Sequence, residues 1–293
     1  MHWAATGASV LGAGLTYCLV EARAYTRRDV HVSACDRAAR ARGLRILHIS
    51  DLHLAPWDRD RARWVAQLVD VQPDLVVASG DFLAHANSMP LIHRALGPLT
   101  DFPGAFVLGS NDFFGPRLKN PFSYLGRNTR RSLGAPLPAA ELVGYLSARG
   151  WLDLDNACGQ VNLRGITVEL RGTGDAHIDY DDYSAVAGAW QVDTSLRLAV
   201  THAPYARVLN AMADDEPDLI LAGHTHGGQI TVPFVTALTT NCDLPVAQAR
   251  GLSTVTSHDG ARIPMHVSAG VGTSPIFPVR LGCRPEATVI TID

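Results

Sequence analysis

Five short motifs in this chain of 293 residues carry side chains that could bind metal ions. In chain order they are Asp51-Leu52-His53, Gly80-Asp81, Gly109-Ser110-Asn111-Asp112, His202-Ala203-Pro204 and Gly223-His224-Thr225-His226-Gly227-Gly228. Their side chains offer nitrogen and oxygen but no thiolate, a donor set that suits Mn, Fe or Zn better than a cysteine-bound structural zinc does. Each motif alone occurs by chance in many proteins, but the ordered combination predicts a metal centre.

Each motif directly follows a short apolar segment that is predicted to be a strand. The predicted strands cover residues 44–50, 74–79, 104–108, 196–201 and 218–222. Segments with helical spacing lie between them, at 58–71, at 90–96 and from about residue 205 onward. Because ligands bind beyond the carboxyl ends of strands in open α/β sheets, we expect the five motifs to meet at one site. Periodicity alone therefore predicts an α/β protein.

The remaining segments complete the predicted organisation. We expect a helix at 138–149, a β-hairpin formed by 161–163 and 166–170, and strands at 266–269 and 288–292. Scattered charge between residues 21 and 43 indicates a connection rather than core. The expected division is an N-terminal segment at 1–28, a connecting segment at 29–43 and one large domain at 44–293.

The composition is that of an ordinary globular protein, with 47% hydrophobic residues and a formal net charge of −3. Such a charge provides no basic field, so no nucleic-acid partner is indicated. The five cysteines are scattered without a C-x-x-C pair, which argues against a disulfide framework and favours a reducing compartment. No sequence feature indicates an oligomeric state.

The N-terminal segment carries no charged side chain from Trp3 to Val20. Its length suits a short membrane span, and Arg23, Arg27 and Arg28 follow it. By the positive-inside rule, this flank would keep the large domain on the cytoplasmic face of the cell membrane. The alternative is an N-terminal helix of a soluble cytoplasmic protein.

From about Leu44 to the C-terminus, the ordered motifs resemble the calcineurin-like metallophosphoesterase superfamily. Its signature is D-x-H, then G-D, then G-N-H-[DE], then H, then G-H-x-H, and the last of these is matched by residues 223–226. The ending at residues 282–286 resembles a bacterial, membrane-associated branch. The resemblance implies a four-layer αββα sandwich with two mixed β-sheets, and a metallophosphoesterase catalytic domain at 44–293.

The resemblance also implies a role for each matching residue. One metal ion would bind Asp51, His53 and His226, Asp81 would bridge both ions, and the second ion would bind His202, His224 and an asparagine, here Asn111. Two divalent ions, Mn, Fe or Zn, would hold a bridging hydroxide that attacks phosphorus. The implied substrate is a phosphodiester or a lipid-linked phosphate. The alternatives are a phosphomonoesterase acting on a soluble substrate and a catalytically degenerate metal-binding module.

The third motif departs from the family signature. If its loop is one residue longer, Asn111 is the ligand and Asp112 takes the place of the signature histidine. If the match is gapless, Ser110 stands at the ligand position and Asn111 replaces the histidine. We prefer the first alignment, since an amide oxygen is a better ligand than a neutral hydroxyl. Either way the histidine that assists the leaving group is absent, an assistance worth about 10²–10⁴-fold, and Asp112 or His85 is the expected substitute.

Three other segments can each be interpreted either as part of a functional site or as an ordinary loop or packing element. The acidic stretch 175–182, which includes His177, is expected to be a solvated loop rather than another metal site. The basic cluster at 117–131 could bind a phosphate-rich substrate or an anionic lipid surface, or be a solvated loop face. Residues 233–234 and 275–277 could form an apolar wall for a lipid or aromatic leaving group, or pack in the ordinary way.

Overall fold

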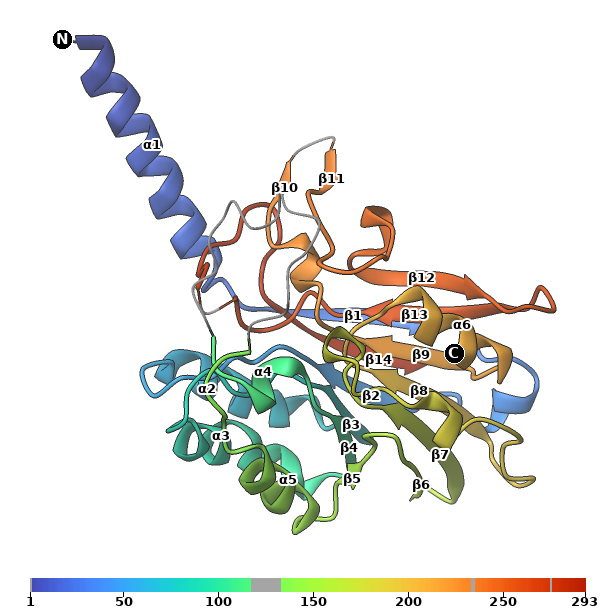
Figure 1. Cartoon of the computed structure of the whole chain (residues 1–293). Coiled ribbons are helices and arrows are strands. Elements are labelled where there is room, and N and C mark those ends of the chain that lie inside the picture. Colours follow the sequence, from blue (N-terminus) through green and yellow to red (C-terminus); the bar gives the residue numbers. More distant parts are fainter. Residues whose placement is uncertain (1, 117–132, 233–234, 275) are drawn as a thin grey trace.

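The structure is a computed structural model that describes residues 2–116, 133–232, 235–274 and 276–293. Within these residues the first sheet has six strands in the order β1-β14-β2-β3-β4-β5 (Figure 1). The bounds are Thr26–Val32 for β1, Glu286–Ile292 for β14, Arg45–Ile49 for β2, Leu75–Ser79 for β3, Gly104–Val107 for β4 and Leu152–Asp153 for β5. Strands β2 to β5 run parallel and β14 pairs antiparallel with β2, so the sheet is mixed.

The second sheet has the order β12-β13-β9-β8-β7-β6 over the same described ranges. The bounds are Gly251–Thr256 for β12, Arg262–Val267 for β13, Leu219–Ala222 for β9, Leu196–Thr201 for β8, Ile166–Thr173 for β7 and Cys158–Leu163 for β6. The four central strands are parallel and both edge strands pair antiparallel, so this sheet is mixed as well. A short ribbon of β10 (Thr231–Val232) and β11 (Val235–Ala237) lies apart from both sheets.

Side chains alternate across each strand, and this alternation stacks four layers. Ile46 of β2 and Leu198 of β8 belong to the core between the two sheets. Leu47 points the other way and packs with the helices α2 (Arg59–Gln67), α3 (Met89–Leu96) and α5 (Ala139–Ser147). On the far side α6 (Ala206–Asp214) covers the second sheet (Figure 1). The implied αββα sandwich with two mixed sheets is confirmed.

The sequence pattern does not predict β1. Residues 26–32 pair in parallel with β14 at the edge of the first sheet, so part of the expected connecting segment belongs to the sheet. Most of this strand is polar and exposed because an edge strand buries little surface, and its apolar alternation is therefore weak. β5 and β12 are likewise absent from the predicted elements, the first because it is short and the second because it is rich in serine and threonine.

Helix α1 (His2–Glu21) extends away from the two sheets (Figure 1). Its C-terminal turn is attached to the domain, since the Arg280 N–H donates to the Cys18 carbonyl and the Gly282 N–H donates to Glu21. Leu15, Tyr17, Leu19 and Val20 are exposed. In the described part of the chain, α1 included, we find no helix with the length and apolarity needed to cross a membrane. The anchor at 1–28 stays a prediction.

Candidate metal centre

The predicted ligands lie in loops at the carboxyl ends of parallel strands, where the backbone takes an uncommon conformation. Asp51, His53, Asp81, His224 and His226 all have a positive φ, between 42° and 68°. Such a conformation costs a non-glycine residue about 1–3 kcal/mol and persists only where the surroundings enforce it. A set of strained residues at one edge of two sheets is typical of a functional site.

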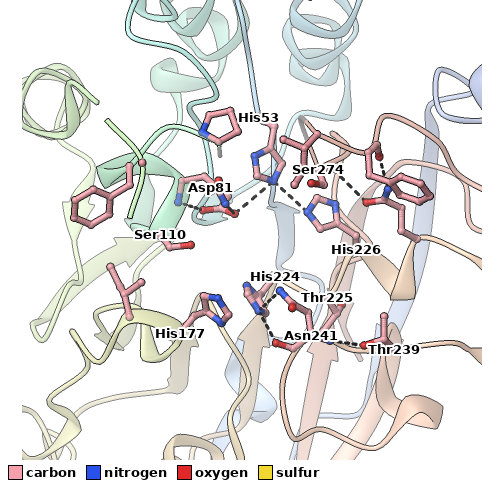
Figure 2. Close-up of a pocket in the computed structure, with 18 of the residues that line it drawn as sticks. His53, Asp81, Ser110, His177, His224, Thr225, His226, Thr239, Asn241 and Ser274 are labelled. Carbon is pink, nitrogen blue, oxygen red and sulfur yellow. Dashed lines mark hydrogen bonds and ion pairs between the residues drawn. The ribbon is translucent and has the colours of Figure 1, made fainter. Parts of the chain in front are cut away.

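The first group of ligand atoms comes from Asp51, His53 and His226, which lie within 4.8 Å of one another. The two Nε2 atoms of the histidines are 3.1 Å apart (Figure 2), and Nε2 of His226 is 3.5 Å from Oδ1 of Asp51. Their rings stack with centroids 5.0 Å apart. Two imidazole nitrogens converging on one carboxylate oxygen form a geometry that suits a cation.

The second group comes from Asp51, Asp81 and His202, again within 4.8 Å. Oδ2 of Asp81 lies 3.4 Å from Nε2 of His53 and 3.4 Å from Nε2 of His202. Asp81 therefore stands midway between a histidine of the first group and a histidine of the second. This is the placement expected of a carboxylate that bridges two ions.

Unpaired buried atoms show that these groups fit metal ions. Among the described residues, Oδ1 of Asp51 and Nε2 of His202 are buried without a hydrogen-bond partner. The His202 ring donates from Nδ1 to the carbonyl of Ser79 over 2.7 Å, so the neutral ring carries its lone pair on Nε2. A buried polar atom without a partner is costly, and a bound divalent cation would satisfy both of them.

The electrostatics favour the metal-binding protonation state at His53 and Asp81. Burial lowers the pKa of His53 to about 4, so its ring is neutral at neutral pH. Burial raises the pKa of Asp51 to about 6. Burial also acts to raise the pKa of Asp81, but His202 and His53 outweigh it and hold that pKa well below its usual range. At His202, burial acts to lower the pKa, but Asp81 and Asp175 outweigh it and hold that pKa well above its usual range. Neutral imidazole and ionised carboxylate are the forms that coordinate a metal.

Comparison with known proteins identifies the family. The family model described as calcineurin-like phosphoesterase matches residues 44–228, more than half of the chain and all five motifs. The chain belongs to the calcineurin-like phosphoesterase family. Together with the two ligand groups, this membership makes it a metal-dependent phosphoester hydrolase.

Relatives of this calcineurin-like phosphoesterase occur in distant bacteria. It is 28% identical to the uncharacterized metallophosphoesterase YkoQ of Bacillus subtilis, over 84% of this chain and 82% of that protein. It is 26% identical to the phosphodiesterase YaeI of Escherichia coli, over 85% and 82%. Among solved structures, a 5'-nucleotidase precursor from Thermus thermophilus matches with a TM-score of 0.44 and 12% identity, over 85% of this chain and 54% of that one.

His224 lies beside the two groups whose ligand atoms are within 4.8 Å of one another, and its assignment to the second ion stays a prediction. Its ring is 5.2 Å from the ring of His202 and 4.7 Å from that of His177, measured between centroids. Its Nε2 is 3.3 Å from both the carbonyl oxygen and the side-chain nitrogen of Asn241 (Figure 2). Asn241 has no motif around it, so nothing in the sequence identifies it as a neighbour of the site.

The third motif places Ser110 and Asn111 in the cavity next to Asp81. The Asn111 side chain donates to Oδ2 of Asp81, and its backbone N–H donates to Oδ1, both over 2.8 Å. Gly109 permits this approach, because a Cβ there would lie 2.2 Å from Oδ1 of Asp81. Asn111 thus holds the Asp81 carboxylate, and its assignment as a metal ligand stays a prediction.

Asp112 does not occupy the position expected of a residue that assists the leaving group. It is fully buried and is absent from the described residues that line the cavity. Its two oxygens accept four backbone N–H bonds, from Gly109, Asp81, Phe82 and Leu83, at 2.7–2.9 Å. The carboxylate therefore positions the Gly80-Asp81 loop, because none of its hydrogen-bonding capacity points toward a substrate.

The other expected substitute, His85, is also turned away. Its Nδ1 accepts the backbone N–H of Asn87, and its ring packs edge-on against Trp57 with centroids 5.7 Å apart. It is not among the described residues of the cavity wall. Neither expected substitute for the signature histidine thus reaches the site.

The acidic stretch at 175–182 is not simply a solvated loop. Asp175 is fully buried, and His177 lines the cavity. The stretch closely follows β7, the neighbour of β8, and a strand end beside a motif-bearing strand is the signal that could have identified it. The expectation of a solvated loop is therefore corrected, because this stretch places His177 beside His224.

Predicted ligands line a cavity of about 470 Å³, namely His53, Asp81, Asn111, His224 and His226. One wall is apolar, with Ile230, Leu238, Ile276 and Phe277. Phe277 is 49% exposed, so this wall reaches the surface. Ile276 and Phe277 thus take the wall position foreseen for 275–277, whereas the basic cluster at 117–131 and residues 233–234 lie outside the described residues.

Proposed function

We propose that this metal-dependent phosphoesterase hydrolyses a phosphodiester or a lipid-linked phosphate. The observation that carries the proposal is the apolar wall of the cavity, formed in part by Leu238, Ile276 and Phe277, beside the predicted ligands His224 and His226. A bare phosphate group needs no such wall, whereas an ester with an apolar substituent would bury that substituent there. The name of YaeI, a phosphodiesterase, points the same way.

The chain supplies the residues for this chemistry in defined roles. Two divalent cations bound at the centre would polarise the phosphoryl group and activate water. Asp51, Asp81 and the histidines His53, His202 and His226 would hold them, and Asn111 would orient Asp81 through its two hydrogen bonds. The buried, preformed arrangement needs little reorganisation when charge develops on the phosphoryl oxygens.

Turnover of matched esters tests the proposal. The full chain with Mn²⁺ is assayed on bis(p-nitrophenyl) phosphate and p-nitrophenyl phosphate, beside Asp81→Asn and the exposed control Asp60→Asn. We expect faster diester hydrolysis, lost in Asp81→Asn by about 10³-fold and retained in Asp60→Asn. Preference for the monoester favours the phosphomonoesterase alternative, and no turnover of either ester favours a degenerate metal-binding module. Turnover unaffected by Asp81→Asn contradicts the site.

The apolar wall has its own test. Diesters with a short and a long alkyl substituent are compared in the wild type, in Phe277→Ser and in Val192→Ser, which removes an apolar side chain exposed elsewhere. We expect Phe277→Ser to raise KM for the long-chain ester only. Equal effects of the two variants would contradict a lipid substituent on this wall.

We further infer that the chain works at the cytoplasmic face of the cell membrane, with α1 in contact with the lipid. The exposed side chains Leu15, Leu19 and Val20 support this, as does the attachment of α1 to the strand-free segment that follows Phe277. In flotation with anionic vesicles, we expect the full chain to bind. The variant in which Leu15, Leu19 and Val20 are all replaced by Ser is expected not to bind, whereas the control Thr16→Ser is expected to bind like the wild type. Unchanged partitioning of the triple variant would favour a soluble cytoplasmic protein.

A further inference from the structure

His177 brings an imidazole into the cavity from outside the five motifs. It belongs to the 3-10 segment Ala176–Ile178 and lines the cavity together with Ser110 and His224. Figure 2 shows Ser110, His177 and His224 around the part of the cavity next to Asp81. Four histidines line the cavity within the described residues, and the other three are predicted ligands. His177 is thus the histidine of the cavity wall without an assigned role.

A buried carboxylate connects His177 to the altered third motif. Oδ1 of Asp175 accepts the backbone N–H of His177 over 2.8 Å, and Oδ2 accepts the backbone N–H of Ser110 over 2.7 Å. Asp175 is fully buried, so losing either hydrogen bond would leave part of a carboxylate unsatisfied in the interior. These two bonds hold the loop of His177 at a fixed separation from the motif that lacks a histidine.

The His177 ring is oriented by a second contact. Nδ1 of His177 lies 3.0 Å from the hydroxyl of Tyr205, within hydrogen-bond distance. Tyr205 closely follows His202 in the chain and is the N-terminal flanking residue of α6. The backbone of His177 is therefore set by the third motif and its ring by the loop of the fourth motif. A side chain fixed at both ends is suited to meet a substrate without reorganisation.

We propose that His177 is a catalytic residue that donates a hydrogen bond to the oxygen through which the leaving group departs. Tyr205 is its positioning residue. His177 would thereby supply the assistance that the third motif cannot supply, since Asp112 and His85 both point elsewhere. The inference rests on the proposed phosphoester hydrolysis. A hydrogen bond from a fixed donor is strongest when the departing oxygen carries the most charge, so poor leaving groups benefit most.

A pair of amide variants isolates the donor atom. The amide nitrogen of His177→Asn can reach the Tyr205 side of the ring, whereas that of His177→Gln can reach the position of Nε2. On a series of diesters with leaving groups of decreasing acidity, we expect kcat of His177→Asn to fall by about 10²-fold for an alkyl leaving group and by less than about tenfold for p-nitrophenol. His177→Gln is expected to recover part of the loss. An equal loss across the series would overturn the proposal.

Tyr205→Phe tests the positioning role. It keeps the aromatic ring and removes only the hydroxyl that meets Nδ1. We expect a smaller loss than in His177→Asn, in kcat rather than KM, and no further loss when both changes are combined. Additive losses in the double variant would show that Tyr205 does not act through His177.

Two measurements that do not depend on turnover separate this inference from the proposed function. Metal content after dialysis is expected to be equal in the wild type and His177→Asn, and loss of metal would mean that His177 is a ligand instead. Calorimetric binding of inorganic phosphate to the Mn²⁺-loaded chain is expected to weaken about tenfold in His177→Asn and much less in the exposed control His258→Asn. Unchanged phosphate binding would overturn the role of His177 even if no ester is hydrolysed.

Discussion

Among the described residues, the side chains of Asp51, His53 and His226 converge within 4.8 Å on one side of Asp81, whereas on the other side His202 is the one histidine that lies within that distance of Asp51 and Asp81. His224 turns toward Asn241 instead. The first half is built wholly from motif residues at the ends of β2 and β9. The second half is surrounded by residues from loops that contain none of the five motifs. It also contains the altered third motif.

From this difference we expect the second half to tolerate substitution better than the first. In the first half the ligand atoms of Asp51, His53 and His226 face one another, so any substitution would remove one of the donor atoms that converge on one point. In the second half, Asp175, His177 and Asn241 surround the third and fifth motifs, and residues of the surrounding loops can take over a lost contact. We therefore expect the two halves to respond unequally to substitution.

The largest expected difference is between His53→Ala and His224→Ala. His53→Ala removes a nitrogen that lies 3.4 Å from Asp81 and 3.1 Å from His226, and should lower kcat/KM by about 10³-fold together with bound metal. His224→Ala should lower metal affinity by about 10–100-fold, the range seen for residues behind the ligands. Diester hydrolysis and metal per chain are measured together. Equal losses of activity and of bound metal in the two variants would contradict the expected difference between the two halves.

Asp112→Asn comes next in size, because the carboxylate accepts four backbone N–H bonds beside Asp81. An amide nitrogen cannot accept a hydrogen bond, so some of these groups would lose their acceptor at about 1–3 kcal/mol each. Urea unfolding should show this loss of stability, with exposed Asp60→Asn as the control. Full stability with reduced activity would instead support the catalytic role expected from the sequence.

Asn111→Ala and Ser110→Ala separate the two alignments of the third motif. Asn111 donates to the charged Asp81 over 2.8 Å, and a hydrogen bond to a charged group contributes about 1.5–3 kcal/mol. We expect Asn111→Ala to slow hydrolysis by about 10–100-fold and Ser110→Ala by less than about tenfold. A larger effect at Ser110 would support the gapless alignment, with Ser110 at the ligand position.

The smallest effect concerns Asp155, which accepts the N–H of Leu108 directly before the third motif. Burial raises its pKa from 3.8 to about 7. The folded state therefore disfavours the ionised form, and the contribution of Asp155 to stability declines as pH rises from 3.8 through about 7. Asp155→Asn should gain stability relative to the wild type between pH 5 and pH 8 in urea unfolding. A pH-independent difference would show that Asp155 does not titrate there.

Much of the fold follows from local patterns in the chain. The apolar runs ending at Ile49, Ser79 and Ala222 form central strands, because a strand buried on both faces must be apolar throughout. β1 is not predicted, because an edge strand with one partner needs little apolar surface and so lacks an apolar pattern. The ordered motifs at strand ends likewise predict the family and the convergence of Asp51, His53, Asp81, His202 and His226.

The sequence by itself determined the residue types and their places at strand ends, because strand positions are encoded in short apolar segments and ligand chemistry in side chains. Only the tertiary structure decided that Asp112 supports a loop, that Asn241 meets His224 and that His177 enters the cavity. These contacts join residues far apart in the chain. No local pattern encodes such a pair, since it forms only when the loops that follow different strands meet at one edge of the folded domain.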